Sequence, residues 1–86
     1  MSRISKEKQD RIKEDILREM FENYPEFEYT ESVAEKIIRD NEFTLKLLKE
    51  MKRKNLINEI RESSGRKIKR KWQMKKEVYY AYKDLI

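Results

Sequence analysis

Gly65 is the only glycine in the 86-residue sequence, and it lies between two segments in which apolar and polar residues alternate, 56–62 and 66–74. Alternation with a period of two is typical of a β-strand, because successive side chains point to opposite faces of a sheet. Tight hairpin loops need a residue with positive φ, which glycine adopts without steric cost. The pattern therefore predicts a β-hairpin that turns at Gly65.

The alternation on the second strand of this hairpin separates two sets of side chains. One face carries Ile68, Arg70, Trp72 and Met74, and the other carries Lys67, Lys69 and Lys71. Near the base of the hairpin we expect packing against helices by Ile60, Trp72 and Met74. Towards the tip, the second strand is basic on both faces.

Apolar residues between Ile12 and Tyr24 recur at spacings of three and four, which predicts a first helix. Ser5 can cap its N-terminus. Pro25 ends it, because the residue before a proline is pushed out of the α region. Residues 26–30 alternate acidic and aromatic side chains and predict a short extended segment.

A second helix is predicted over residues 30–40, with two possible starts. Thr30 can act as the N-cap, and Ser32 with Glu35 forms an alternative capping box. The expected buried face consists of Val33, Ala34, Ile37 and Ile38.

A third helix is predicted over residues 42–55, with Asn41 as its N-cap. Its core stripe consists of Leu47, Leu48 and Met51, and the opposite side carries Lys46, Lys49 and Arg53. Phe43 and Leu45, at its start, are expected in the core, although Leu45 could also contact a thymine methyl group.

Composition restricts the chemistry that the chain can perform. The sequence has no cysteine and no histidine, which removes disulfides, thiol nucleophiles, the commonest zinc ligands and imidazole catalysis. The carboxylates at 14, 15, 19 and 22 alternate with Lys13 and Arg18 in the pattern of a solvated helix face. We therefore expect no enzymatic activity, no metal and no cofactor.

Charge is distributed unevenly along the chain. Residues 1–40 hold 8 Lys/Arg against 11 Asp/Glu, a balance of −3, whereas residues 41–86 hold 14 against 6, a balance of +8. A basic half of this kind suits a polyanionic partner. No apolar run approaches the roughly 20 residues of a membrane span, and no signal-peptide pattern is present, so a cytoplasmic protein without a membrane partner is expected. The abundance of Lys and Glu resembles that of heat-adapted proteins, although AT-rich coding gives the same bias.

The order helix, short strand, helix, helix, hairpin, helix resembles the winged helix-turn-helix superfamily over essentially the whole chain. Residues 32–57 are similar to small prokaryotic, archaeal or viral regulators of the MarR, ArsR and PadR kind. In those families a small residue stands at the position of Ala34 and leucines stand at those of Leu48 and Met51. Gly-Leu-Ile precedes the wing where this chain has Asn-Leu-Ile at 55–57. The resemblance implies a mainly α fold with a small β-hairpin, as a single winged-helix domain over 1–86.

In such proteins the third helix enters the major groove of double-stranded DNA, and the wing touches the backbone or the minor groove. Basic side chains at matching places agree with this implication, as do helix N-termini, whose N–H groups bind phosphate. The candidate DNA-binding residues are Thr30, Ser32, Asn41, Lys46, Lys49, Arg53, Arg66, Lys67, Lys69 and Lys71.

The last helix, predicted over residues 75–86, has more apolar side chains than a small core accepts. Its core stripe consists of Val78, Tyr82 and Leu85. A second surface, formed by Tyr79, Tyr80 and Ile86, predicts a homodimer interface.

Two alternatives to a DNA-binding transcriptional regulator stay open at this point. A winged-helix module can bind structured RNA, the ribosome or a protein assembly, and an architectural protein can bind DNA without reading its sequence. The basic wing favours a nucleic acid, whereas the acidic first helix and the apolar start of the third suit a protein contact.

Overall fold

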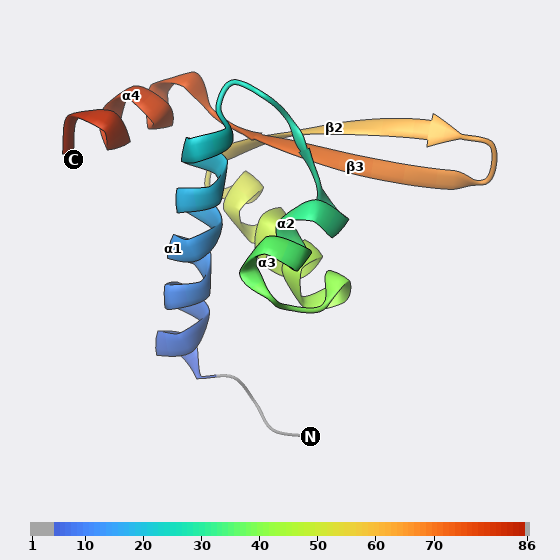
Figure 1. Cartoon of the computed structure of the whole chain (residues 1–86), viewed down its shortest axis with the longest axis horizontal. Helices are drawn as coiled ribbons and strands as arrows, with labels where there is room; N and C mark the ends of the chain where they lie inside the picture. The colour runs from blue at the N-terminus through green and yellow to red at the C-terminus, as the bar shows by residue number, and fades with distance from the viewer. Residues whose placement is uncertain (1–4, 86) are drawn as a thin grey trace.

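The computed structural model of the chain describes residues 5–85 and confirms the predicted order of elements (Figure 1). The elements are α1 (Lys6–Asn23), β1 (Glu28–Tyr29), α2 (Thr30–Ile37), α3 (Asn41–Arg53), β2 (Ile57–Ser64), β3 (Lys67–Met74) and α4 (Lys76–Leu85). The strands form one antiparallel sheet in the order β1-β3-β2. The fold is therefore mainly α with a small β-hairpin, as expected. None of the described helices is long and apolar enough to cross a membrane.

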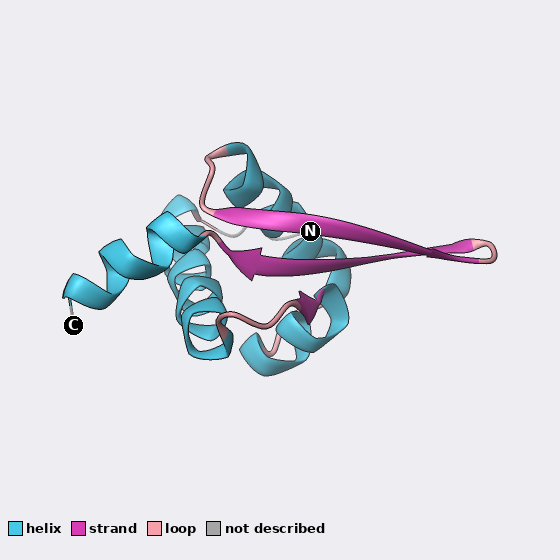
Figure 2. Cartoon of the chain, turned by 90° about the horizontal axis from the view of Figure 1, so that it is seen from above, coloured by secondary structure: helices cyan, strands magenta, loops and turns pink. Residues whose placement is uncertain are grey.

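The hairpin turns at the glycine, as predicted. Gly65 has φ +63°, and the register pairs Ser64 with Lys67, which leaves a two-residue turn. At the other end Ile57 pairs with Met74. We call this hairpin, residues 57–74, the wing. Its outer part extends well beyond the helices (Figures 1 and 2).

The core lies where α1, α2, α3 and the base of the sheet meet. Its fully buried side chains include Ile16, Met20, Val33, Leu47, Leu48, Met51, Ile57, Trp72 and Met74. The predicted stripes of α1 and α3 are thus confirmed, as is the burial of Trp72. The first helix begins and ends as predicted, because the Ser5 hydroxyl accepts a hydrogen bond from the backbone N–H of Lys8 and α1 stops before Pro25.

The predicted caps of the second and third helices are wrong. Helix α2 has Tyr29 at its N-cap with no side-chain cap bond. Helix α3 is capped by Asp40 rather than Asn41, since the Asp40 Oδ1 accepts from the Phe43 N–H at 2.7 Å. An aspartate cap is favoured over asparagine by the positive end of the helix dipole.

Helix α2 also ends earlier than predicted, at Ile37. The backbone N–H of Arg39 donates to the carbonyl of Ala34, and Ile38 adopts a left-handed conformation with φ 58°. This turn points Ile38 outward, so that its side chain is 86% exposed instead of buried.

The prediction that Ile60 packs on the helices is wrong as well. Ile60 pairs with Lys71, whereas Ile57 and Glu59 pair with Met74 and Trp72. Because faces alternate along a strand, Ile57 and Glu59 share the inner face with Trp72. Ile60 lies on the outer face and is 39% exposed.

Candidate nucleic-acid interface

The exposed side of α3 carries the cations that the sequence predicted there. Lys46, Lys49 and Arg53 are exposed, and together with Glu42 and Leu45 they line a shallow pocket of about 250 Å³. We call this surface the α3 face. Leu45 is half-buried against the core, so the expected core contact and access to a ligand coexist in one side chain.

A second hollow, of about 210 Å³, lies between the wing and the starts of α2 and α3. We call it the wing cleft. It is lined by Tyr29, Thr30, Glu31, Asn41, Glu42, Leu45, Ile68, Lys69 and Arg70. Since Glu42 and Leu45 line both hollows, the α3 face and the wing cleft form one continuous surface.

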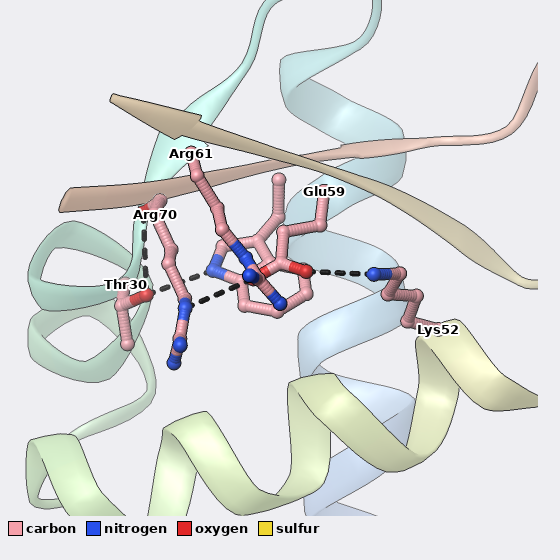
Figure 3. Close-up of polar contacts among 6 residues, drawn as sticks. Thr30, Lys52, Glu59, Arg61 and Arg70 are labelled. Carbon is pink, nitrogen blue, oxygen red and sulfur yellow. Dashed lines mark hydrogen bonds and ion pairs between the residues drawn. The ribbon is translucent and has the colours of Figure 1, made fainter. Parts of the chain in front are cut away.

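Glu59 forms ion pairs with three cations at the base of the wing (Figure 3). Its side chain is only 3% exposed. Lys52 Nζ from α3 lies 2.7 Å from Oε1, while Arg70 Nε and Arg61 Nε lie 3.0 and 3.5 Å from Oε2. Burial raises the pKa of the Glu59 carboxyl, but the Lys52 hydrogen bond and the neighbouring positive charges outweigh it and lower the pKa overall. Glu59 is therefore held as a carboxylate.

Thr30 ties the start of α2 to the wing instead of capping the helix. Its hydroxyl accepts a hydrogen bond from Trp72 Nε1 at 2.8 Å and donates to the carbonyl of Arg70 at 3.3 Å (Figure 3). The Thr30 side chain is thus already used within the chain, and a phosphate contact at Thr30 would have to come from its backbone.

Ser32 is turned away from this surface, because its hydroxyl donates to the buried Glu28 carboxylate at 2.8 Å. Lys36 pairs with the same carboxylate and with Glu19, each at 2.9 Å. Both hydrogen bonds raise the pKa of Lys36, and the one to Glu19 has the larger effect. By contrast, Asn41 is exposed and lines the wing cleft. Of the three predicted helix-terminus residues, Thr30 and Asn41 therefore border the surface and Ser32 does not.

Lys71 is committed to contacts on the outer face of the wing. Its Nζ pairs with Glu62 at 3.0 Å and lies 5.8 Å from the centre of the Phe27 ring. The Tyr29 hydroxyl donates to the same Glu62 carboxylate at 2.5 Å. That bond, followed by the one from Lys71, lowers the pKa of Glu62. Lys71 is also absent from the lining of the wing cleft, unlike Lys69.

The remaining predicted wing cations stand at the tip. Arg66 and Lys67 are exposed beside the Gly65 turn. Lys69 is also exposed and lies 5.5 Å from the centre of the Tyr29 ring, so its charge stays accessible beside the cleft.

Sequence reasoning missed Arg61 and Arg70 as interface candidates. The alternation of the strand had already placed Arg70 on the inner face, which borders the helices. Arg61 pairs directly with Arg70 across the hairpin, so the same period applied to β2 would have found it.

The predicted dimer residues divide into three cases. Tyr79 is half-buried and stacks on Phe21 and Tyr24, with ring centres 4.9 and 4.1 Å apart, so part of its ring is used within the chain and its place in a dimer interface stays a prediction. Tyr80 is 50% exposed, and Ile86 lies outside the described residues. Leu85, expected in the core, is 83% exposed because α4 extends away from the body of the molecule (Figure 1).

No protein-family model matches the sequence, and no curated protein matches it either. The structure is similar to that of ZitR from Lactococcus lactis, described as a zinc-responsive MarR family member, with a TM-score of 0.63 and 17% identity over 95% of this chain and 51% of that one. A mutant of ZitR gives a TM-score of 0.62 and 16% identity over 81% of this chain and 47% of that one. The chain thus spans about half the length of either structure. At this level of identity the likeness concerns the fold, and residues 5–85 adopt the winged-helix fold that these MarR-family structures share.

Proposed function

We propose that the chain is a non-catalytic regulator that binds double-stranded DNA, with α3 in the major groove and the wing on the backbone. The observation that carries the proposal is the continuity of the α3 face with the wing cleft. Lys46, Lys49 and Arg53 stand at one end of this surface, and Lys69 and Arg70 stand at the other. Cations spaced along a helix and a projecting hairpin suit two successive features of a duplex, a groove and its flanking phosphates.

The neighbouring carboxylates are compatible with this function. Glu50, on the same helix as the α3 face, pairs with Lys13 of α1 at 3.0 Å, and this contact lowers the pKa of Glu50. Its charge is thereby neutralised locally. Glu42 remains exposed between the α3 face and the wing cleft, where a carboxylate can accept a hydrogen bond from a cytosine amino group.

The proposal carries no zinc dependence over from ZitR. The sequence has neither histidine nor cysteine, and the described residues include no group of three or more acidic side chains placed to hold a metal ion. A DNA-binding role is consistent with a cytoplasmic location and with a single winged-helix domain over residues 1–86.

The test is a comparison of duplex DNA with structured RNA across a range of salt concentrations. Changing Arg66, Lys67 and Lys69 together to Ala should weaken duplex binding equally for all sequences and flatten its salt dependence by up to about three units of slope, because each lost phosphate contact releases about one counterion less. The matched control changes Lys6, Lys8 and Arg11, three exposed cations of α1, together to Ala. Equal effects of the two triple variants would remove the wing from the interface.

Base reading by α3 is tested separately. Lys46→Ala and Lys49→Ala should reduce affinity for a selected site more than affinity for random duplex. Equal losses on both would point to the architectural alternative, and tighter binding to structured RNA would point to the RNA alternative.

We also propose a homodimer, with α4 contributing most of the interface. Within residues 76–85 no side chain is fully buried, and the apolar side chains of Tyr80 and Leu85 are exposed. The same exposed side chains suit a protein assembly, part of the first alternative. Sedimentation of the wild-type chain at micromolar concentration separates a homodimer from that alternative, since a monomer would leave Tyr80 and Leu85 to a different protein.

A further inference from the structure

The backbone and the side chain of Arg70 each have a partner at the wing cleft. Its carbonyl accepts a hydrogen bond from Thr30, and its Nε forms an ion pair with the Glu59 carboxylate at 3.0 Å, without the geometry of a hydrogen bond. Figure 3 shows the end of the Arg70 side chain running past Glu59 toward the side on which α2 and α3 lie. Within residues 5–85 its ion pair uses Nε, which leaves the two terminal nitrogens for another acceptor.

Glu59 is an unusual residue for the base of a basic wing. Burying a carboxylate is unfavourable unless it is paired, and a well-packed apolar residue is often at least as stabilising as a buried ion pair. A negative charge also lowers the positive potential that attracts phosphate. Neither stability nor the long-range attraction of phosphate therefore explains a carboxylate at this position. The placement of its cationic partners explains it better.

We propose that Glu59 is a positioning residue for nucleic-acid binding. On the inner face of the wing it fixes the direction of the Arg70 side chain, and with it that of Arg61, so that the Arg70 terminal nitrogens bind a backbone phosphate of DNA in the wing cleft. This inference rests on the proposed function.

Because the charges that line the wing cleft nearly cancel, the direction of its N–H donors decides whether it can hold a phosphate. Glu31 and Glu42 line the cleft together with Lys69 and Arg70, so the net local charge is close to zero. A phosphate is held there by the paired N–H donors of a guanidinium at short range, a geometry that lysine does not offer.

The hairpin contains a matched pair of carboxylates for the test. Glu59 and Glu62 are both on β2, and each is bound to a lysine, but Glu62 pairs with Lys71 on the outer face. If charge alone mattered, Glu59→Gln and Glu62→Gln would both tighten binding to a random-sequence DNA duplex. We expect Glu62→Gln to tighten it and Glu59→Gln to weaken it about tenfold, the equivalent of one charge-assisted contact.

A second variant covers the case in which Glu59→Gln does not fold. Arg70→Lys keeps the charge and removes the forked donors, and it should weaken duplex binding about fivefold or more with little change in salt slope. Arg18→Lys, the same exchange at an exposed position of α1, should leave affinity unchanged. If Glu59 acts through Arg70, Glu59→Gln should add little further loss in the Arg70→Lys background.

The outcomes separate this inference from the function on which it rests. Failure of the wild-type chain to bind any duplex rejects the proposed function, and the inference with it. Duplex binding that is tightened by Glu59→Gln, or is unchanged by Arg70→Lys, rejects the inference alone. Circular dichroism confirms that each variant is folded under the conditions of the binding measurement.

Discussion

Replacing Ile38 with glycine should stabilise the protein, although the change removes a large apolar side chain. Ile38 ends α2 with φ 58° and ψ 55°, in the left-handed region. A side chain on Cβ clashes there with the following carbonyl, at a cost of roughly 1–2 kcal/mol for an L-residue. A β-branched residue in this region is an outlier, whereas glycine adopts it freely.

Two effects oppose the stabilisation by Ile38→Gly, the loss of buried apolar surface and the greater flexibility of the unfolded chain, and the first is small at this position. The Ile38 side chain is 86% exposed, so truncating it forfeits only about 0.2–0.4 kcal/mol of burial. Glycine makes the unfolded chain more flexible, which costs about 0.5–1 kcal/mol. The balance favours Ile38→Gly by about 0.5 kcal/mol, equivalent to about 2–4 °C in the melting temperature of a domain of this size.

Thermal and urea unfolding followed by circular dichroism measure this difference. Ile38→Ala is the control, because it removes the exposed atoms but keeps Cβ, and its stability should stay within about 0.5 kcal/mol of the wild type. Asn55, which has φ 62°, is a second control: asparagine tolerates this region, so Asn55→Gly should gain less than Ile38→Gly. A loss of more than about 1 kcal/mol in Ile38→Gly would refute the reasoning, since it would mean that Ile38 makes a stabilising contact.

Three further predictions concern stability. Glu50 and Glu59 have pKa values lowered below the ordinary 4.5. Their contribution to the free energy of unfolding is therefore present above pH 4.5 and is lost as the pH falls through the lowered pKa values. Glu59→Gln should make this loss smaller in unfolding curves recorded from pH 7 to pH 3. Tyr79→Ala should destabilise the fold by about 2–3 kcal/mol because of its stacking on Phe21 and Tyr24, whereas Tyr80→Ala should change monomer stability by less than about 0.5 kcal/mol in urea titrations. Trp72→Phe should cost about 2 kcal/mol in the same assay, since Trp72 is fully buried and donates to Thr30; an unchanged midpoint would show that this hydrogen bond contributes nothing.

The features that the sequence predicted correctly have causes that lie close together in the chain. Ser5 caps a helix through the backbone three residues later, and Gly65 turns a hairpin between the strands that flank it. The apolar stripes of α1 and α3 follow from helical periodicity alone. Such features need no knowledge of the tertiary structure.

The errors arise where a distant residue takes over a side chain. Thr30 has the sequence of an N-cap, but Trp72 lies 42 positions away and donates to its hydroxyl. Lys71 belongs to a basic run, but Glu62 of β2 and Phe27 of the loop before β1 both contact it. Nothing near Thr30 or Lys71 in the sequence indicates these partners. The sequence could therefore propose candidate cations, but it could not divide them into exposed cations and cations paired within the chain.

For the proposed DNA binding, that division gives the two carboxylates of the wing different consequences. Glu59 and Glu62 fix the cations near the base of the wing, on its inner and outer faces, while Arg66 and Lys67 at the tip keep their charges exposed. Exposed charges act over a Debye length and are weakened by salt, whereas a fixed guanidinium acts only at contact and depends on its direction. The tip should therefore determine the salt dependence of binding and the base its geometry, so that substitutions at Arg66 and Lys67 change the salt slope while those at Arg70 shift affinity at every salt concentration.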